Sequence, residues 1–240
     1  LREFALKHLT DYYDLLRLPS ISAQKEALPE TAELLVELFN ELGATRVEKL
    51  GSFESAPAVF AEFKGNDPTK TVLFYQHYDV QPPEPLEKWE SDPFEPTIRE
   101  GKLYARGASD NKGELISRLV LVKYFKENGG LPVNVKFFVE GEEEIGSPHV
   151  AQIVQENREK LAADACIWEG GGKNYVDNYQ IVGGMRGITV FDVETTTADI
   201  DLHSSLASYA ENAAWRLVRG LATLRDDTGK VLVEGFYDDV

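Results

Sequence analysis

The stretch Thr71-Val-Leu-Phe-Tyr-Gln-His77-Tyr-Asp79-Val-Gln-Pro82 decides the fold, because it joins a buried strand to ionisable residues at the strand's end. The apolar run at 72–75 is β-branched and aromatic, which predicts a strand covered on both faces of a sheet. Residues i and i+2 of an extended chain project to the same side, so His77 and Asp79 can act together. His77 would bind a metal and Asp79 would orient the imidazole. Taken alone, this triplet is a weak signal, and a histidine beside a solvated aspartate explains it better.

The composition is that of a globular protein with an acidic surface. The chain has 240 residues, of which 42% are hydrophobic and 10% aromatic, enough for a packed core in one or two domains. Its 25 Lys and Arg against 41 Asp and Glu give a net charge of −16, which argues against nucleic-acid or membrane binding. The single cysteine, Cys166, excludes an intramolecular disulfide and favours a reducing compartment, and its apolar neighbours predict burial. No apolar run reaches about 18 residues, so the sequence predicts a soluble cytoplasmic protein.

Hydrophobic periodicity predicts alternating helices and strands. Apolar residues at helical spacing mark helices at 4–19, 29–43, 114–128 and 148–161. Short β-prone runs mark strands at 46–50, 58–64, 71–77, 133–139 and 165–168, with a hairpin formed by 96–99 and 102–105. This order favours an α/β fold in which helices cover both faces of a sheet.

Polar residues follow directly after several of these strands. They are His77 and Asp79, Glu143 and Glu144, and Glu169, while Asp110 follows the hairpin. In α/β sheets, ligands bind beyond the carboxyl ends of the strands, so these side chains are expected to meet there. Each acidic position alone is better explained as an ordinary solvated turn, but their joint placement is not.

One imidazole with several carboxylates and no thiolate suits Zn²⁺, Mn²⁺ or Co²⁺. Asp110, between two glycines, is a candidate bridge between two ions, because small neighbours allow close approach. Glu143 and Glu144 would point to opposite sides of an extended chain, so one could bind metal while the other moves a proton. The sequence has no motif of a serine hydrolase, a phosphate-binding loop, a dinucleotide site or an H-E-x-x-H metalloprotease.

At these residues the sequence resembles the di-metal amidohydrolases and peptidases that include carboxypeptidase G, succinyl-diaminopimelate desuccinylase, aminoacylase and carnosinase. The likeness is closest to the dipeptidase and carnosinase branch. The matching stretches are 77–82, 107–113, 140–147 and 201–204. The resemblance implies a three-layer catalytic domain at 1–185 with a mixed, mostly parallel sheet. It also implies the beginning of a smaller α+β lid and dimerisation domain at 186–240, with a strand at 188–195 and a helix at 211–224.

The resemblance also implies a role for each candidate residue. Two divalent ions, zinc with manganese or cobalt as alternatives, would be held by His77, Asp110, Glu144 and Glu169, with Asp110 bridging both. Asp79 would stand behind His77, and Glu143 would be the general base. The peptide bond from Asp110 to Asn111 is expected to be cis. From the lid, His203 would stabilise the oxyanion in the active site of a partner subunit, so a homodimer is expected.

The resulting hypothesis is a metallopeptidase of dipeptidase type, in which a metal-activated water cleaves the amide bond of a small peptide. An N-acyl-amino-acid deacylase with the same metals is one alternative, and a non-catalytic metal-binding or dimerisation module is another. Two departures from the family pattern keep them open. The family's last histidine ligand has no match here, so the sequence is expected to stop within the lid. Glu169 stands where carnosinase-like members carry Asp, whereas carboxypeptidase-like and deacylase-like members carry Glu.

Overall fold

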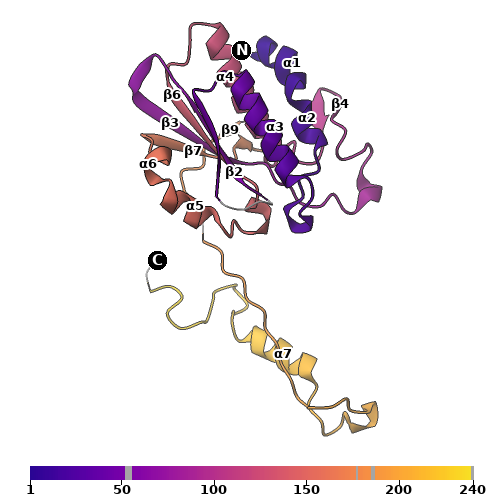
Figure 1. Ribbon diagram of the computed structural model, residues 1–240. Helices are drawn as coiled ribbons and strands as arrows, with labels where there is room; N and C mark the ends of the chain where they lie inside the picture. The colour runs from indigo at the N-terminus through magenta and orange to yellow at the C-terminus, as the bar shows by residue number, and fades with distance from the viewer. Residues whose placement is uncertain (52–55, 177, 185–186, 239–240) are drawn as a thin grey trace. The chain divides into compact units, whose positions relative to one another are not determined.

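The computed structural model describes residues 1–51, 56–176, 178–184 and 187–238, and the chain divides into two compact units, Leu1–Ile181 and Val182–Val240 (Figure 1). The helices of the first unit are α1 (Arg2–His8), α2 (Tyr13–Arg17), α3 (Leu28–Glu41), α4 (Lys112–Glu127), α5 (Val150–Glu156) and α6 (Arg158–Leu161). Its strands are β1 (Arg46–Leu50), β2 (Ala58–Phe63), β3 (Asp67–His77), β4 (Thr97–Arg99), β5 (Lys102–Tyr104), β6 (Val133–Glu140), β7 (Ala165–Trp168), β8 (Gly172–Lys173) and β9 (Tyr179–Gln180). Its 3₁₀ turns are η1 (Leu9–Tyr12), η2 (Ser22–Gln24), η3 (Leu86–Lys88) and η4 (Glu143–Ile145). The second unit holds η5 (Ser204–Leu206) and α7 (Ala213–Ala222).

The main sheet has the order β1-β2-β6-β3-β7. β3 is parallel to β6 and to β7, whereas β2 is antiparallel to β1 and to β6. The predicted α/β fold with a mixed sheet is therefore confirmed. Because β3, β6 and β7 run the same way, their carboxyl ends lie along one edge of the sheet, where the predicted polar residues follow.

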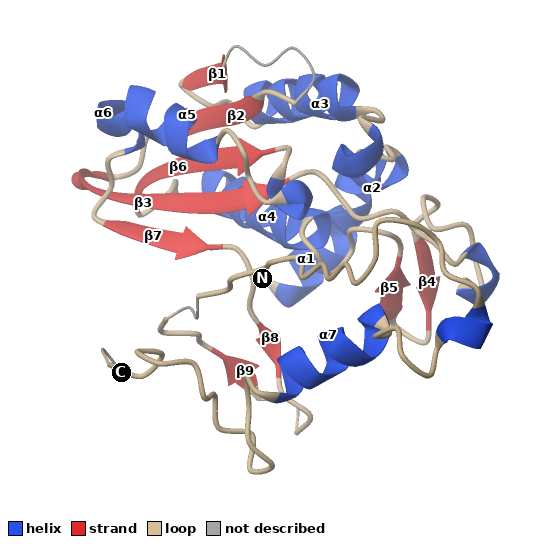
Figure 2. Ribbon diagram, turned by 90° about the horizontal axis from the view of Figure 1, so that it is seen from below, coloured by secondary structure: helices blue, strands red, loops and turns tan. Residues whose placement is uncertain are grey.

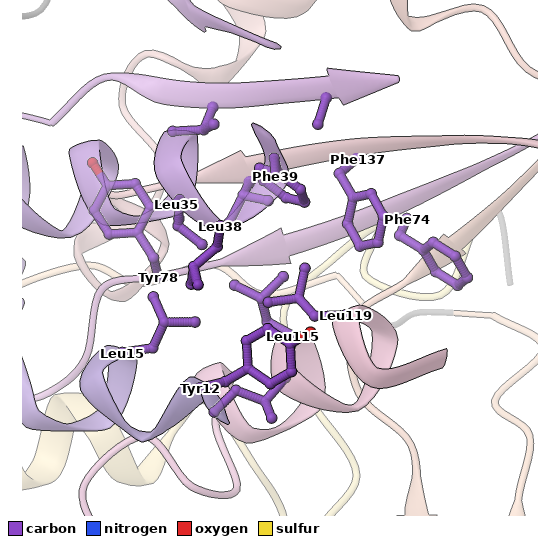
Figure 3. Packing of buried hydrophobic residues seen from close by; sticks show 14 of the residues in the cluster. Tyr12, Leu15, Leu35, Leu38, Phe39, Phe74, Tyr78, Leu115, Leu119 and Phe137 are labelled. Carbon is purple, nitrogen blue, oxygen red and sulfur yellow. The ribbon is translucent and has the colours of Figure 1, made fainter. Parts of the chain in front are cut away.

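Helices cover both faces of this sheet and make three layers (Figure 2). On one face, Phe137 of β6 packs against Phe39 of α3 and Phe74 of β3, with ring centroids 5.0 and 5.3 Å apart (Figure 3). Helices α2 and α4 add Leu15 and Leu115 to this cluster. Neighbouring strand residues point to opposite faces, so the next residues along β6 and β3 form a second cluster under α5 and α6. Its buried members are Leu50, Ala58, Phe60, Tyr75, Phe138, Ile153 and Leu161.

The first predicted helix, at 4–19, is broken into α1, η1 and α2. The buried residues begin only after α1: Tyr12, Tyr13, Leu15 and Leu16 are all buried, whereas α1 itself has no buried residue. The helix predicted at 148–161 is likewise divided into α5 and α6. It is interrupted at Asn157, whose side-chain amide donates to the carbonyl of Ile153 over 2.9 Å. The backbone of Asn157 leaves the helical region there, with φ −120° and ψ 24°.

Cys166 is exposed on β7, so the prediction of a buried cysteine is wrong. The sheet ends at β7, all four residues of which are exposed. An apolar neighbourhood in the sequence predicts burial only where a second strand and a covering helix are present. None of the described helices combines the length and apolar character that a membrane span requires.

In the second unit, the prediction of a strand at 188–195 is wrong, because no strand is assigned to the described residues 187–203. Ile188, Val190 and Phe191 are exposed, and a β-prone run becomes a strand only when a neighbour pairs with its backbone. The predicted helix does form, as α7. Its N-cap is Asn212, whose side-chain oxygen accepts hydrogen bonds from the backbone N–H groups of Ala214 (2.9 Å) and Trp215 (3.3 Å).

Candidate metal centre

His77 ends the central strand β3 and is only 1% exposed. Its Nδ1 faces Asp79, at 3.0 Å from the backbone oxygen and 3.3 Å from Oδ1 of the carboxylate. A hydrogen on Nδ1 would be held there, which directs the other ring nitrogen, Nε2, beyond the end of the strand. The geometry expected for the His77–Asp79 pair is therefore present.

Carboxylates from separate stretches surround Nε2 of His77. Nε2 lies 3.0 Å from Oδ1 of Asp110, 3.1 Å from Oε2 of Glu169 and 3.9 Å from Oε2 of Glu143. Ligand atoms of His77, Asp110 and Glu144 all lie within 4.8 Å of one another. We call His77, Asp110, Glu143, Glu144 and Glu169 the carboxylate–imidazole cluster.

Asp110 is brought to the cluster by the turn that precedes α4. Its peptide bond to Asn111 is cis, as the resemblance implied. The side-chain oxygen of Asn111 accepts a hydrogen bond from the backbone N–H of His77 over 3.3 Å, which ties this turn to the end of β3. Gly113 allows the turn to close, since a Cβ there would lie 1.9 Å from the carbonyl oxygen of Ala108.

Asp79 links the end of β3 to the turn η4. Its carboxylate is fully buried, and its two oxygens accept hydrogen bonds from the backbone N–H groups of Glu143 (3.2 Å) and Glu144 (3.0 Å). Glu143 and Glu144 were expected to lie in extended chain, and this is wrong: they lie in a 3₁₀ turn. The buried carboxylate of Asp79 offers both backbone groups an acceptor in this tight turn.

Two further residues hold the centre together and were missed from the sequence. Gln81 donates from its side-chain amide to the carboxylate and the backbone oxygen of Glu144, both over 2.9 Å. Lys112 is fully buried and donates to the carbonyl oxygen of Leu18 over 2.6 Å. Burial lowers the pKa of Lys112 to about 7, although the negative charge of Asp79 acts in the opposite direction. Only their place inside the matching stretches 77–82 and 107–113 could have drawn attention to them.

The concentration of negative charge shifts the pKa values of the cluster. Burial acts to lower the pKa of His77, but hydrogen bonds and charge from Asp79 and Glu169 outweigh it and raise this pKa to about 11. Burial raises the pKa of Glu143 and of Glu144, and neighbouring carboxylates add to the rise in both. The metal-free centre therefore favours protonated forms.

The cluster fits a divalent cation. Oε2 of Glu169 is buried and lies 3.1 Å from Nε2 of His77, beside the carboxylates of Asp110 and Glu143. Buried carboxylates are costly to keep charged, and like charges this close repel one another. A doubly charged ion would relieve both, and oxygen and imidazole donors match zinc, manganese or cobalt.

His203 belongs to the second unit, whereas the cluster is built from the first. Its Nδ1 accepts a hydrogen bond from the backbone N–H of Ser205 over 3.2 Å and lies 2.9 Å from that residue's hydroxyl. The assignment of 186–240 to a lid that carries His203 to an active site stays a prediction.

Comparison with known proteins places these residues in a wider group. The family model described as peptidase family M20/M25/M40 matches residues 73–235. The Beta-Ala-His dipeptidase of Homo sapiens is 36% identical over 205 residues, which are 83% of this chain and 40% of that protein. The Cys-Gly metallodipeptidase dug1 of Schizosaccharomyces pombe is 34% identical over 244 residues, covering 93% of this chain and 50% of that protein. The chain thus spans half or less of the length of these two relatives.

Solved structures give the same picture. The M20 family metallo-carboxypeptidase Sso-CP2 from Sulfolobus solfataricus has a TM-score of 0.83 at 40% identity, covering 97% of this chain and 53% of that chain. Human carnosine dipeptidase 1 has a TM-score of 0.71 at 27% identity, covering 99% of this chain and 53% of that chain. The carboxylate–imidazole cluster therefore lies on the fold of known metallopeptidases.

Proposed function

This chain belongs to the peptidase family M20/M25/M40, and on that premise we propose that the protein is a metal-dependent dipeptidase that hydrolyses small peptides. The observation that carries the proposal is the carboxylate–imidazole cluster at the carboxyl ends of β3 and β7. There, carboxylate oxygens of Asp110, Glu143 and Glu169 lie within 3.9 Å of Nε2 of His77. The family relationship supplies the reaction class, and the cluster supplies the donors for its metals.

Two zinc ions, or manganese or cobalt in their place, would be held by His77, Asp110, Glu144 and Glu169. Asp110 would bridge the two ions, because one of its oxygens already lies 3.0 Å from Nε2 of His77 and its side chain is grouped with that of Glu144. When bound, such ions polarise the scissile carbonyl and lower the pKa of a water molecule toward about 7. Asp79 would keep the proton on Nδ1 of His77, so that the lone pair of Nε2 is available to bind metal.

Glu143 would act as the general base. Its Oε2 faces the cluster at 3.9 Å from Nε2 of His77, and no metal role is required of it. Burial, followed by the charges of Glu169 and Glu144, raises the pKa of Glu143, although His77 opposes the shift. A carboxylate with a raised pKa can take a proton from the attacking water and return it to the leaving amine.

His203 would stabilise the oxyanion that forms on the scissile carbonyl. Its Nδ1 is engaged by Ser205, so Nε2 is the nitrogen that could reach a substrate. We propose this role for the site of a partner subunit in a homodimer, and we propose the reducing cytoplasm as the location because the chain has one cysteine. Sedimentation of the protein at several concentrations tests the dimer, and a monomer at all of them would reject it.

The substitution Glu143→Ala tests the mechanism. We expect the bound metal to stay unchanged while turnover of a dipeptide falls by about 100- to 10,000-fold, the usual contribution of a general base. The matched control is Glu142→Gln, because Glu142 pairs with His149 at 2.6 Å outside the cluster. Unchanged turnover in Glu143→Ala would remove Glu143 from the mechanism.

A substrate panel separates the dipeptidase from the alternatives. Dipeptides such as Cys-Gly and β-Ala-His, which the names of two relatives specify, are compared with N-acyl amino acids. Faster cleavage of the acyl amino acids would favour the deacylase. Binding of metal with no turnover of either class would favour the non-catalytic module.

A further inference from the structure

The two oxygens of the Glu169 carboxylate face different neighbours. Oε1 accepts a hydrogen bond from the indole N–H of Trp168 over 3.1 Å, while Oε2 is the buried oxygen that faces His77. The backbone gives the side chain little support, because Glu169 is followed by three glycines, and two of them, Gly170 and Gly171, have positive φ. The indole N–H therefore fixes the position of Oε1.

The indole in turn rests on the centre of the sheet. Trp168 and Tyr75 are paired in register across β7 and β3, and their rings are stacked with centroids 3.8 Å apart and planes inclined by 23°. Tyr75 is buried, and its hydroxyl donates to Glu140, whose carboxylate also accepts from the hydroxyl of Ser147 over 2.8 Å. A ring fixed by packing and by a hydrogen bond is a rigid platform for the indole.

We propose that Trp168 is a positioning residue for the metal centre. Its indole N–H holds Oε1 of Glu169 so that Oε2 is presented to the ion beside His77. This inference rests on the proposed function, because it assigns a purpose to Trp168 only if the cluster binds metal. It adds an aromatic residue on the edge strand to the set that determines metal affinity.

The test compares zinc affinity, measured by competition with a chelating dye, in the wild-type protein and in Trp168→Phe. Phenylalanine retains a ring for stacking on Tyr75 but lacks the N–H. We expect the affinity for zinc to fall by about 10- to 100-fold, which is typical for loss of a partner that orients a ligand. Trp215→Phe is the matched control, since Trp215 is 64% exposed in the second unit. The Trp215→Phe variant should bind zinc with the affinity of the wild-type protein.

A double-mutant cycle distinguishes positioning from a general effect on the fold. In Glu169→Ala the carboxylate is absent, so adding Trp168→Phe should cause no further loss of zinc affinity. If Trp168→Phe lowers the affinity by the same factor with and without Glu169, Trp168 does not act through Glu169 and the proposal is overturned.

A fluorescence titration leaves Trp168 itself intact, and it decides the matter if Trp168→Phe does not fold. In the variant Trp89→Phe/Trp215→Phe, Trp168 is the one remaining tryptophan of the chain, and its emission should change as zinc saturates the centre. No change at saturation would overturn the proposal. Failure of the wild-type protein to bind zinc at all would instead reject the proposed function, whereas equal affinity in wild type and Trp168→Phe would reject the positioning role alone.

Discussion

Among single residues, His77 is expected to lose a proton when a metal ion binds. In the metal-free chain, burial acts to lower its pKa, but Asp79 and Glu169 raise this pKa from 6.5 to about 11. The imidazole is therefore protonated at neutral pH, and it must lose a proton before Nε2 can bind metal. We expect zinc binding at pH 7 to release a proton and to strengthen as the pH rises toward about 11.

Calorimetry in two buffers that differ in heat of ionisation measures this proton release. A binding heat that is identical in the two buffers would contradict the predicted charge state of His77.

The raised pKa of His77 also affects the stability of the chain without metal. The folded state holds the proton on His77 more tightly than the unfolded state does. The stabilisation that results is fully present below pH 6.5 and is lost as the pH rises through about 11.

Gln81 is a second residue whose role can be tested alone. Its amide donates two hydrogen bonds to Glu144, so Gln81→Leu should free that carboxylate and weaken zinc binding by about 10- to 100-fold. Gln152→Leu is the control, because Gln152 donates over 2.8 Å to Glu156 on the exposed surface of a helix. Equal affinities in the two variants would show that Gln81 does not orient Glu144.

The residues that could be identified from the sequence are histidine and carboxylates, which are metal-ligand types, placed at the ends of strands. His77, Asp110, Glu144 and Glu169 lie together in the structure, although their roles stay predictions. Their supporting residues could not be recognised in the same way. An amide or an indole carries no chemical signature of its own, and only the folded chain shows that it reaches a particular carboxylate.

Among the elements, β6 contributes a central residue of the core, Phe137. Its Phe137 is fully buried and contacts rings of Phe39, Phe63 and Phe74 at 5.0, 6.0 and 5.3 Å. Phe137→Ala should lower the free energy of unfolding by about 3–5 kcal/mol, measured by urea denaturation, because it leaves a cavity between two layers. Ile98→Ala serves as the control, since Ile98 is 59% exposed, and a loss as large as that of Phe137→Ala would refute the assignment of the core.

Local pattern predicted elements well where the sheet and its helices decide burial. The strands at 46–50 and 165–168 have the predicted bounds, as β1 and β7. The helix at 4–19 is broken at Leu9–Tyr12. The strand at 188–195 is absent from the described residues, because a strand depends on backbone pairing with a neighbour that can be distant in sequence. Periodicity describes which residues could be buried, but not whether another element is there to cover them.

For the whole molecule, the division into two units makes a prediction about where metal binding resides. All members of the carboxylate–imidazole cluster lie in Leu1–Ile181, whose main core includes residues of β3, β6 and the helices α2, α3 and α4. A fragment with these residues should fold and bind zinc with an affinity within about threefold of the complete chain, a difference of about 0.65 kcal/mol. Circular dichroism and the dye competition measure both properties. Loss of binding in a folded fragment would show that the second unit contributes to the centre.

The cluster draws its carboxylates and its imidazole from stretches that are distant along the chain and lie together in the folded chain. An ion seated among them would be bound by the native state and not by the unfolded one, so it would act as a cross-link between the ends of β3, β7 and the start of α4. Free zinc at 100 times its dissociation constant would then add about 2.7 kcal/mol to the stability of the fold. For such a protein, the melting temperature would rise and fall with the concentration of free zinc. A shortage of zinc would lower the stability of the fold as well as the activity.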